Sequence, residues 1–154
     1  MNQLRPVRHV SAYALNEFLS VPPTPGSIVV PKSQELYAQG FPVRFIQNFH
    51  VDSPLAEVHS HEDDVFYCLK GCIRLLTGGR LVEPWTNDGL TFLAKRMEEG
   101  KEIILNEGDW LHIPAGQTHQ SFTPDLAHLI VIKVTPREGT VQLDYLQHAR
   151  TLSR

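Results

Sequence analysis

Between residues 28 and 134 the sequence runs through one short segment after another of β-branched and aromatic residues, with glycine and proline between them. Such segments are typical of β-strands, and their number and spacing indicate an all-β sandwich or barrel. A short helix over 12–19 is expected to precede them, and the proline-rich run 21–26 interrupts regular structure after it. The strands we expect cover residues 28–30, 43–51, 56–61, 65–69, 72–77, 90–94, 103–105, 110–113, 119–122 and 126–134.

Three histidines in these strands form the pattern that points most clearly to chemistry. His59 and His61 share one expected strand, and because successive side chains of a strand alternate faces, both imidazoles would point the same way. His119 follows a turn at 114–116 and opens another strand, which could bring a third imidazole to the same place. Histidines in strands also hydrogen-bond in cores or face solvent. Three of them in this register favour a metal site, where each ligand is a neutral imidazole.

Two segments resemble the signatures of the cupin superfamily. The run HSHEDDVFYCLKG, residues 59–71, is similar to the first signature, in which an HxH pair is followed by an acid, six residues and a glycine. The run GDWLHIPAGQTH, residues 108–119, resembles the second signature, with Pro114 and Gly116 at the expected positions. The first signature departs from the common pattern, because its acid is Asp64 in place of glutamate and comes one residue sooner after the second histidine.

The resemblance implies a double-stranded β-helix, the jelly-roll barrel of the cupins, behind the short N-terminal helix. It implies a single cupin domain over residues 1–154, with a barrel core of roughly 28–135 and flanking extensions at 1–27 and 136–154. The site residues it implies are three histidine ligands and one carboxylate ligand: His59, His61, His119 and Asp64. For Asp64 a solvated surface acid in an acidic run is the alternative.

Glu57 stands two residues before His59, so an unbroken strand would place its carboxylate on the same face. It could act as a general base or orient a substrate hydroxyl, and it could equally be a solvent-facing acid at the start of the strand. Ser121 and Thr123 share the strand parity of His119 and could donate hydrogen bonds to a bound oxygen. We predict a catalytic role for Glu57.

Three or four protein ligands leave open positions on an octahedral ion, which is the mark of a catalytic site. Three histidines with a carboxylate suit one divalent transition metal per chain, with Mn, Ni, Zn and Cu all acceptable. Fe(II) is the first choice because Fe(II) oxygenases are frequent among proteins with this resemblance. We therefore expect a metal-dependent enzyme, either an iron dioxygenase (an oxidoreductase) or a related isomerase or lyase, acting on a chelating, oxygen-rich small molecule. The alternative is a non-enzymatic, metal-containing cupin that binds or senses a small molecule.

The composition and charge of the chain limit the classes of partner that we expect. The net charge is −3 and no basic stripe carries interleaved aromatic residues, so nucleic acid is not expected. No apolar run approaches the roughly 20 residues that span a membrane, and the first residues lack the apolar stretch of a secretory signal, so we expect a cytoplasmic protein. Near-continuous apolar strands such as residues 129–134 imply cover on both faces, which predicts a homodimer.

Two further features concern the chain between the signatures. We expect a tight hairpin between the strands at 65–69 and 72–77, with Cys68 and Cys72 reduced and Cys68 a small core residue and not a nucleophile. The segment 78–102 is longer than a minimal hairpin needs. It is either a lid with Trp85 against the substrate or an extended hairpin with Trp85 at a dimer interface, and we favour the second.

Overall fold

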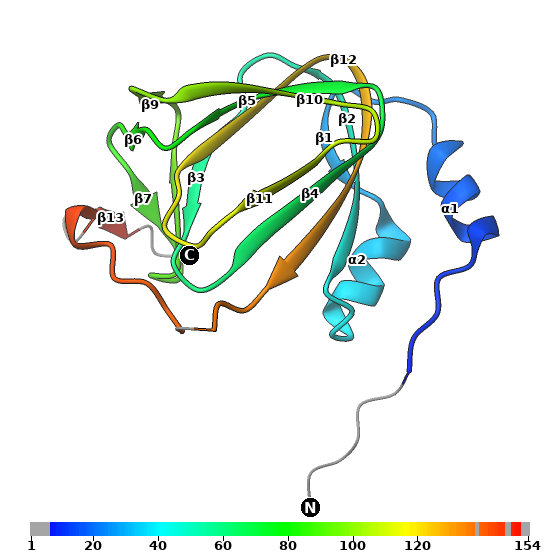
Figure 1. Ribbon diagram of the computed structural model, residues 1–154, viewed down its shortest axis with the longest axis horizontal. Helices are drawn as coiled ribbons and strands as arrows, with labels where there is room; N and C mark the ends of the chain where they lie inside the picture. The colour runs from blue at the N-terminus through cyan, green and yellow to red at the C-terminus, as the bar shows by residue number, and fades with distance from the viewer. Residues whose placement is uncertain (1–6, 138, 147–148, 152–154) are drawn as a thin grey trace, which may run out of the picture.

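The computed structural model of the chain describes residues 7–137, 139–146 and 149–151, and shows a curled pair of sheets with two helices on one side (Figure 1). The helices are α1 (Ala12–Leu19) and α2 (Pro31–Ala38), and a 3₁₀ turn lies at Asp144–Leu146. The strands are β1 (Gly26–Val29), β2 (Val43–Val51), β3 (Ala56–His59), β4 (Asp63–Lys70), β5 (Cys72–Thr77), β6 (Arg80–Leu81), β7 (Trp85–Thr86), β8 (Thr91–Ala94), β9 (Met97–Glu98), β10 (Lys101–Asn106), β11 (Trp110–Ile113), β12 (His119–Val134) and β13 (Arg150–Thr151).

Strand β12 belongs to both sheets and joins them. Its first half pairs with β3 and β5, and its second half pairs with β2 and β4. One sheet therefore has the order β1-β2-β12-β4-β11, and the other β10-β5-β12-β3-β8-β7-β13. Apart from the short parallel pair β7–β13 the pairings are antiparallel. The expected all-β jelly-roll barrel with a short N-terminal helix is confirmed.

The two strands expected at 119–122 and 126–134 are one strand with a bend. The pairing of β12 with β2 shifts register between Thr123 and Leu126, which marks a bulge. In Figure 1 the strand rises from the lower left, turns over the top of the barrel and descends on the opposite wall. The bend therefore returns the two ends of β12 to the same end of the barrel.

The tight hairpin expected between residues 65 and 77 is wrong. β4 pairs with β11 and β12, whereas β5 pairs with β10 and β12, so the two strands lie in different sheets. Gly71 between them has φ +82° and lies against the backbone of Leu126 and Ala127. The chain turns around the corner of the barrel here, which a glycine without a Cβ permits. Cys68 and Cys72 are free, as expected.

Helix α1 has the bounds that the sequence predicted. Ser11 caps it by accepting a hydrogen bond from the Ala14 amide on its side-chain oxygen, at 3.2 Å. Phe18 is buried and its ring lies 5.3 Å from that of Phe45, so the helix packs on the outer face of β2.

Helix α2 was not predicted, although Pro31 at its first position is a recognised start signal. Its polar sequence offers no amphipathic pattern. The Ser33 hydroxyl accepts a hydrogen bond from the Phe45 amide at 2.7 Å, and this contact ties the helix to β2. The loop that follows α2 reaches one end of the barrel, where it contributes to a cavity described below.

The segment 78–102 forms paired strands, of which β7 and β8 extend one sheet while β6 and β9 make a separate two-stranded sheet. β6 pairs with β9, and β7 pairs with β8, which in turn pairs with β3. Leu81, Phe92 and Met97 are buried against Val58, so the segment encloses a part of the core. This is an extended hairpin and not a lid, and the contact of Trp85 with a partner subunit stays a prediction.

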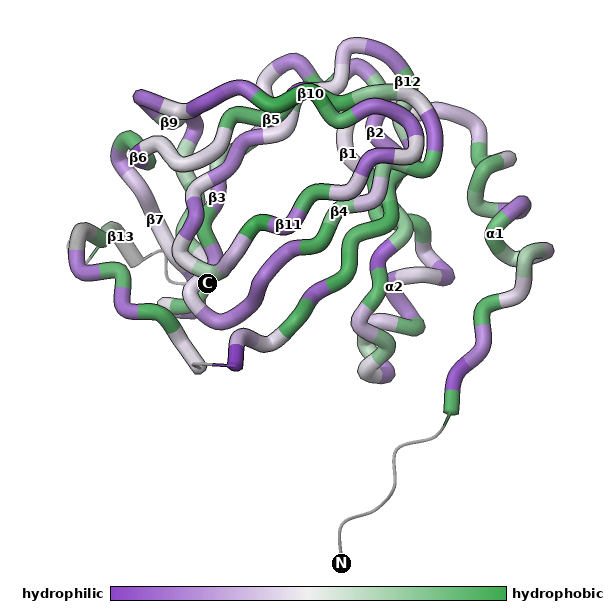
Figure 2. Tube along the Cα trace, viewed as in Figure 1, coloured by the Kyte–Doolittle hydropathy of each residue, from purple (hydrophilic) through white to green (hydrophobic). Residues whose placement is uncertain are grey.

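The main core fills the space between the sheets and leaves one end of the barrel polar. Its buried members are Phe66, Cys68, Ile73, Leu75, Leu105, Ile113, Ala127, Leu129 and Val131. Figure 2 shows β4 changing from hydrophilic at its start to hydrophobic further along. That start is Asp63–Asp64, and Asp64 is buried. A buried carboxylate needs hydrogen-bond or charge partners, so the polar end is where a site is expected.

We expect Gly71→Ala to lower the free energy of unfolding by about 3 kcal/mol, because the new Cβ would have a positive φ and would collide with the Leu126 carbonyl oxygen. Gly89→Ala is the matched control, since Gly89 has φ +73° and nothing lies within 4 Å of the place that a Cβ would take there. The Gly89→Ala substitution should lower the free energy of unfolding by about 1 kcal/mol. Denaturant unfolding measures both, and equal losses would show that the corner contact does not matter.

Candidate metal centre

Four potential ligand residues meet at the polar end of the barrel: Glu57, His59, Asp64 and His119. Each offers one ligand atom, and these atoms all lie within 4.8 Å of one another. Both histidines and Asp64 are buried, while Glu57 is partly exposed. Glu57 and His59 come from β3, His119 is the first residue of β12, and Asp64 lies at the start of β4 in the other sheet.

The facing atoms of these residues are two imidazole Nε2 atoms and carboxylate oxygens. Glu57 and His119 are directly opposite each other in the β3–β12 pairing, and their Oε1 and Nε2 atoms are 3.2 Å apart. His59 Nε2 lies 3.4 Å from Asp64 Oδ2 and 3.7 Å from Glu57 Oε2. Asp64 Oδ2 lies 3.6 Å from His119 Nε2. The four side chains therefore point toward a common centre.

The other ring nitrogen of each histidine is held by a separate contact. His59 Nδ1 lies 3.1 Å from Thr91 Oγ1, and His119 Nδ1 lies 3.2 Å from the Gln117 carbonyl oxygen. Such contacts fix the orientation of metal-binding imidazoles and turn Nε2 toward the common centre. The Gly116 amide donates a hydrogen bond to the His59 carbonyl at 2.7 Å, so the turn before His119 is tied directly to the end of β3.

Lys133 was not predicted as a site residue. Its side chain is 9% exposed, and its ammonium lies 2.6 Å from Asp64 Oδ1, 3.0 Å from Glu62 Oε1 and 3.2 Å from His59 Nε2. Lys133 is directly opposite Asp64 in the β12–β4 pairing. The sequence did hold a signal, since Lys133 continues the inward alternation of Leu129 and Val131 in an otherwise apolar strand.

These contacts control the protonation of the group. Burial raises the pKa of Glu57, but its hydrogen bond with His119 and its attraction to His119, His59 and Lys133 together outweigh burial and lower this pKa to about 2. Burial likewise raises the pKa of Asp64, and its contacts with His59 and Lys133 lower it to about 2. Burial lowers the pKa of His119, yet its hydrogen bond with Glu57 leaves that pKa raised overall. Both carboxylates are therefore ionised at neutral pH.

The structure does not bring His61 into the group. β3 ends at His59, so the alternation that would have aligned the two imidazoles stops there. The His61 side chain is 32% exposed and its Nε2 lies 3.6 Å from Glu62 Oε2. Its ring centroid is 6.3 Å from that of His59. Glu57 and His59 are also two residues apart, and because both lie on β3 their side chains do face the same centre.

Three further residues on strands β4 and β12 are buried: Phe66, Cys68 and Thr123. Phe66 is buried with its ring edge-on to that of His119, at 6.2 Å between centroids, so it forms an apolar wall of the site. Thr123 is buried and its hydroxyl accepts a hydrogen bond from Asn48 Nδ2 at 3.2 Å. Cys68 is buried in the main core, and burial raises the pKa of its thiol to about 11, so it is an inert core residue.

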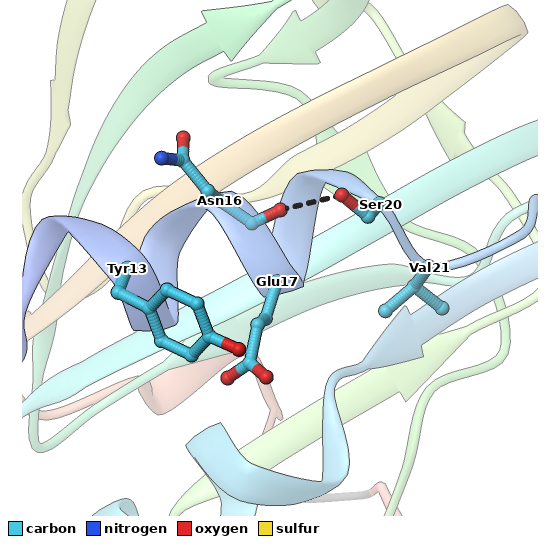
Figure 3. A pocket seen from close by; sticks show the side chains of 5 residues that line it. All are labelled: Tyr13, Asn16, Glu17, Ser20 and Val21. Atoms are coloured by element: carbon cyan, nitrogen blue, oxygen red, sulfur yellow. Dashed lines mark hydrogen bonds between the residues drawn. The ribbon is translucent and has the colours of Figure 1, made fainter.

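A cavity of about 310 Å³ adjoins the group. Its walls are the loop after α2, the residues after β3 and the end of β12, and the residues that line it are Tyr37, Gly40, Phe41, Pro42, His61, Glu62, Lys133, Val134 and Thr135. A second hollow of about 480 Å³ lies along α1 (Figure 3). Its lining of Tyr13, Asn16, Glu17, Ser20 and Val21 includes one carboxylate and no histidine, so it is not a metal site.

No family model matches the chain, and no curated protein matches it. Among solved structures, the chain is similar to protein NMB1881 from Neisseria meningitidis, with 11% identity over 83% of this chain and 100% of that chain and a TM-score of 0.52. The Drosophila melanogaster CENP-C cupin domain is 12% identical over 60% of this chain and 56% of that chain, with a TM-score of 0.44. FeII HppE is 14% identical over 59% of this chain and 41% of that chain, also with a TM-score of 0.44.

The chain spans about 55% of the length of the first solved structures it matches. At these identities the likeness concerns the fold alone. The jelly-roll arrangement of strands that the two signatures implied is present in the structure. Among the described residues, no helix has the length and apolar character needed to cross a membrane.

The metal affinity of this centre should fall as the pH falls from about 8 to about 6. The pKa of His119 is raised from 6.5, so a proton occupies the imidazole more readily than usual and a metal must displace it. Glu57 and Asp64 stay ionised over this range because their pKa values are about 2. Calorimetry in buffers of different ionisation enthalpy measures the protons released. A pH-independent affinity with no proton release would remove His119 from the ligand set.

Proposed function

We propose that this cupin-fold chain is a metal-dependent enzyme that binds one divalent transition metal at Glu57, His59, Asp64 and His119 and acts on a small, oxygen-rich, chelating substrate. The observation that carries the proposal is the convergence of two imidazole nitrogens and two carboxylate oxygens within 4.8 Å at the polar end of the barrel. Structural metal sites commonly have four protein ligands in a closed tetrahedron, whereas an ion that prefers six ligands keeps open positions here.

The donor set fits such an ion. Imidazole nitrogen suits Fe, Zn, Ni and Cu, and carboxylate oxygen suits Mn and other hard ions, so the mixed set accepts any of these ions, and metal availability in the cell selects among them. The two carboxylates are ionised, and their charge balances that of a divalent ion. We retain Fe(II) as the first choice.

A bound ion would supply Lewis-acid activation of a chelating oxygen and, if it is iron, a site for dioxygen. The chain itself supplies orientation and shelter. Thr91 and the Gln117 carbonyl hold the two imidazoles in place, and Phe66 closes the inner side of the site with an apolar ring. Glu57 is the most exposed member of the group, so its carboxylate is the one best placed to contact a substrate.

The cavity lined by Glu62 and Lys133, which contact the group, is the place that we propose for the substrate. At about 310 Å³ it is at the small end of ligand pockets, which suits a small metabolite. The Lys133 ammonium and the His61 imidazole on its wall can donate hydrogen bonds to oxygens of the substrate. This lining supports a polar, oxygen-bearing substrate, and it gives His61 a role at the cavity in place of one at the metal.

Elemental analysis of the chain, purified without chelator or a metal-binding tag, tests the metal site. We expect about one equivalent of metal in the wild type and almost none in His59→Ala or His119→Ala, because each loses an Nε2 ligand. His61→Ala is the matched control and should keep its metal. Glu57→Gln should weaken binding if the carboxylate is a ligand. A wild type that contains no metal and takes up none would remove the basis of the proposal.

Oxygen consumption separates the enzyme from a non-enzymatic metal-containing binder. The Fe(II)-loaded chain, supplied with small hydroxy acids, β-diketones and catechols, should consume oxygen with at least one class, and His61→Ala should raise KM more than it lowers kcat. An oxygen electrode records the first result and initial rates the second. Tight binding with unchanged substrate, for every class and metal tried, would favour the binder.

A further inference from the structure

The ammonium of Lys133 already lies in the candidate metal centre. Its three contacts, to Asp64 Oδ1, Glu62 Oε1 and His59 Nε2, match the three N–H donors of an ammonium group. Two of these three partners, Asp64 and His59, belong to the proposed ligand set. The lysine thus makes hydrogen bonds to the same side chains that would hold the metal.

His59 cannot accept a hydrogen bond from Lys133 and bind a metal through the same nitrogen at the same time. A neutral imidazole has one nitrogen lone pair that can accept a hydrogen bond or bind a metal. Nδ1 of His59 faces the Thr91 hydroxyl, and Nε2 faces both the lysine and the centre. An ammonium 3.2 Å from Nε2 therefore uses the lone pair that the ion needs. A divalent cation and an ammonium a few ångströms apart also repel each other strongly.

We infer that Lys133 is an internal cation that competes with the metal for His59 and Asp64, and that it turns to Glu62 when the metal binds. The inference rests on the proposed function, because it concerns the same centre. Of the three contacts of the ammonium with described residues, the one to Glu62 lies outside the ligand set, and the Glu62 side chain is 15% exposed. Both residues also line the cavity of about 310 Å³, which leaves room for the lysine to move toward that side.

In the metal-free chain Lys133 stabilises the buried carboxylate of Asp64. Asp64 is 2% exposed, and a buried carboxylate without a partner is costly. The lysine supplies the missing charge until a metal replaces it. A lysine that only supported Asp64 from a fixed position would behave differently, because its removal would leave metal affinity unchanged or lower it.

Zn²⁺ titration of the full-length chain by calorimetry, at one fixed pH, tests the inference. Lys133→Met should bind Zn²⁺ about tenfold or more tightly than the wild type, because no ammonium has to be displaced. Lys32→Met is the matched control, since Lys32 is an exposed lysine whose contact is with Glu35 in α2, and its affinity should equal that of the wild type.

Glu62→Gln gives a second test with the opposite sign, and it leaves the buried Asp64–Lys133 pair in place. The displaced ammonium loses its carboxylate partner, so Zn²⁺ should bind several-fold more weakly than to the wild type. In the Lys133→Met background the same substitution should have much less effect, because there is no ammonium to receive. Such a double-mutant cycle isolates the part of the effect that passes through the lysine.

Thermal unfolding with and without Zn²⁺ confirms that each variant is folded and gives a second readout. Lys133→Met should be less stable than the wild type without metal and should gain more in Tm when Zn²⁺ is added.

The outcomes distinguish the two proposals. If the wild type binds Zn²⁺ and Lys133→Met binds it equally or more weakly, the competition is wrong and the metal centre stands. If Lys133→Met alone binds Zn²⁺, the lysine excludes the metal and the proposed metal-dependent function is wrong. If neither binds, both proposals are wrong.

Discussion

The bend in β12 is the constraint on which the candidate site depends. Because the strand turns over the top of the barrel, its two ends return to one place on opposite walls (Figure 1). Each end then contributes one cross-strand pair: His119 opposite Glu57 in one sheet, and Lys133 opposite Asp64 in the other. Directly opposite side chains on one face of a sheet are close enough to interact. The site is thus the meeting of two such pairs, completed by His59 next to Glu57 on β3.

The same geometry places the four residues of the group on paired strands and leaves a cavity beside them. Strand pairing fixes Glu57, His59, Asp64 and His119 through backbone hydrogen bonds, and the apolar core lies directly behind them. Residues after β3 and the loop after α2 are outside that strand pairing, and they form the cavity wall together with Lys133 and Val134 at the paired end of β12. In many binding sites the ligand residues lie on paired strands while loop residues form much of the pocket beside them.

The sequence predicted the barrel, the first helix, and three of the four residues in the group as metal ligands, because signature spacing and strand alternation are properties of the backbone. It placed Glu57 on the same face as His59, and the catalytic role predicted for Glu57 stays a prediction. The expectation for His61 extended that alternation one residue pair beyond His59, where β3 ends and the chain turns. The strand end depends on the tertiary contacts of Ser60 and Gly116, whose amides bond to Leu90 and His59. The wrong hairpin at Gly71 has a similar origin, since a glycine with positive φ serves a barrel corner as well as a hairpin turn.

The presence of Glu57 beside the two histidines determines the charge of the group. A third imidazole in its place would be neutral when binding a metal, whereas Glu57 adds a second negative charge beside Asp64. Two ionised carboxylates in a partly buried site repel each other unless positive charge lies near. The ammonium of Lys133 supplies that charge in the metal-free chain, where the hydrogen bond with Glu57 also raises the pKa of His119, and a divalent ion would supply the charge in the loaded chain. On this argument the glutamate and the lysine are linked features of one site: the extra carboxylate strengthens attraction for a cation, and the lysine sets how much of that attraction a metal can use.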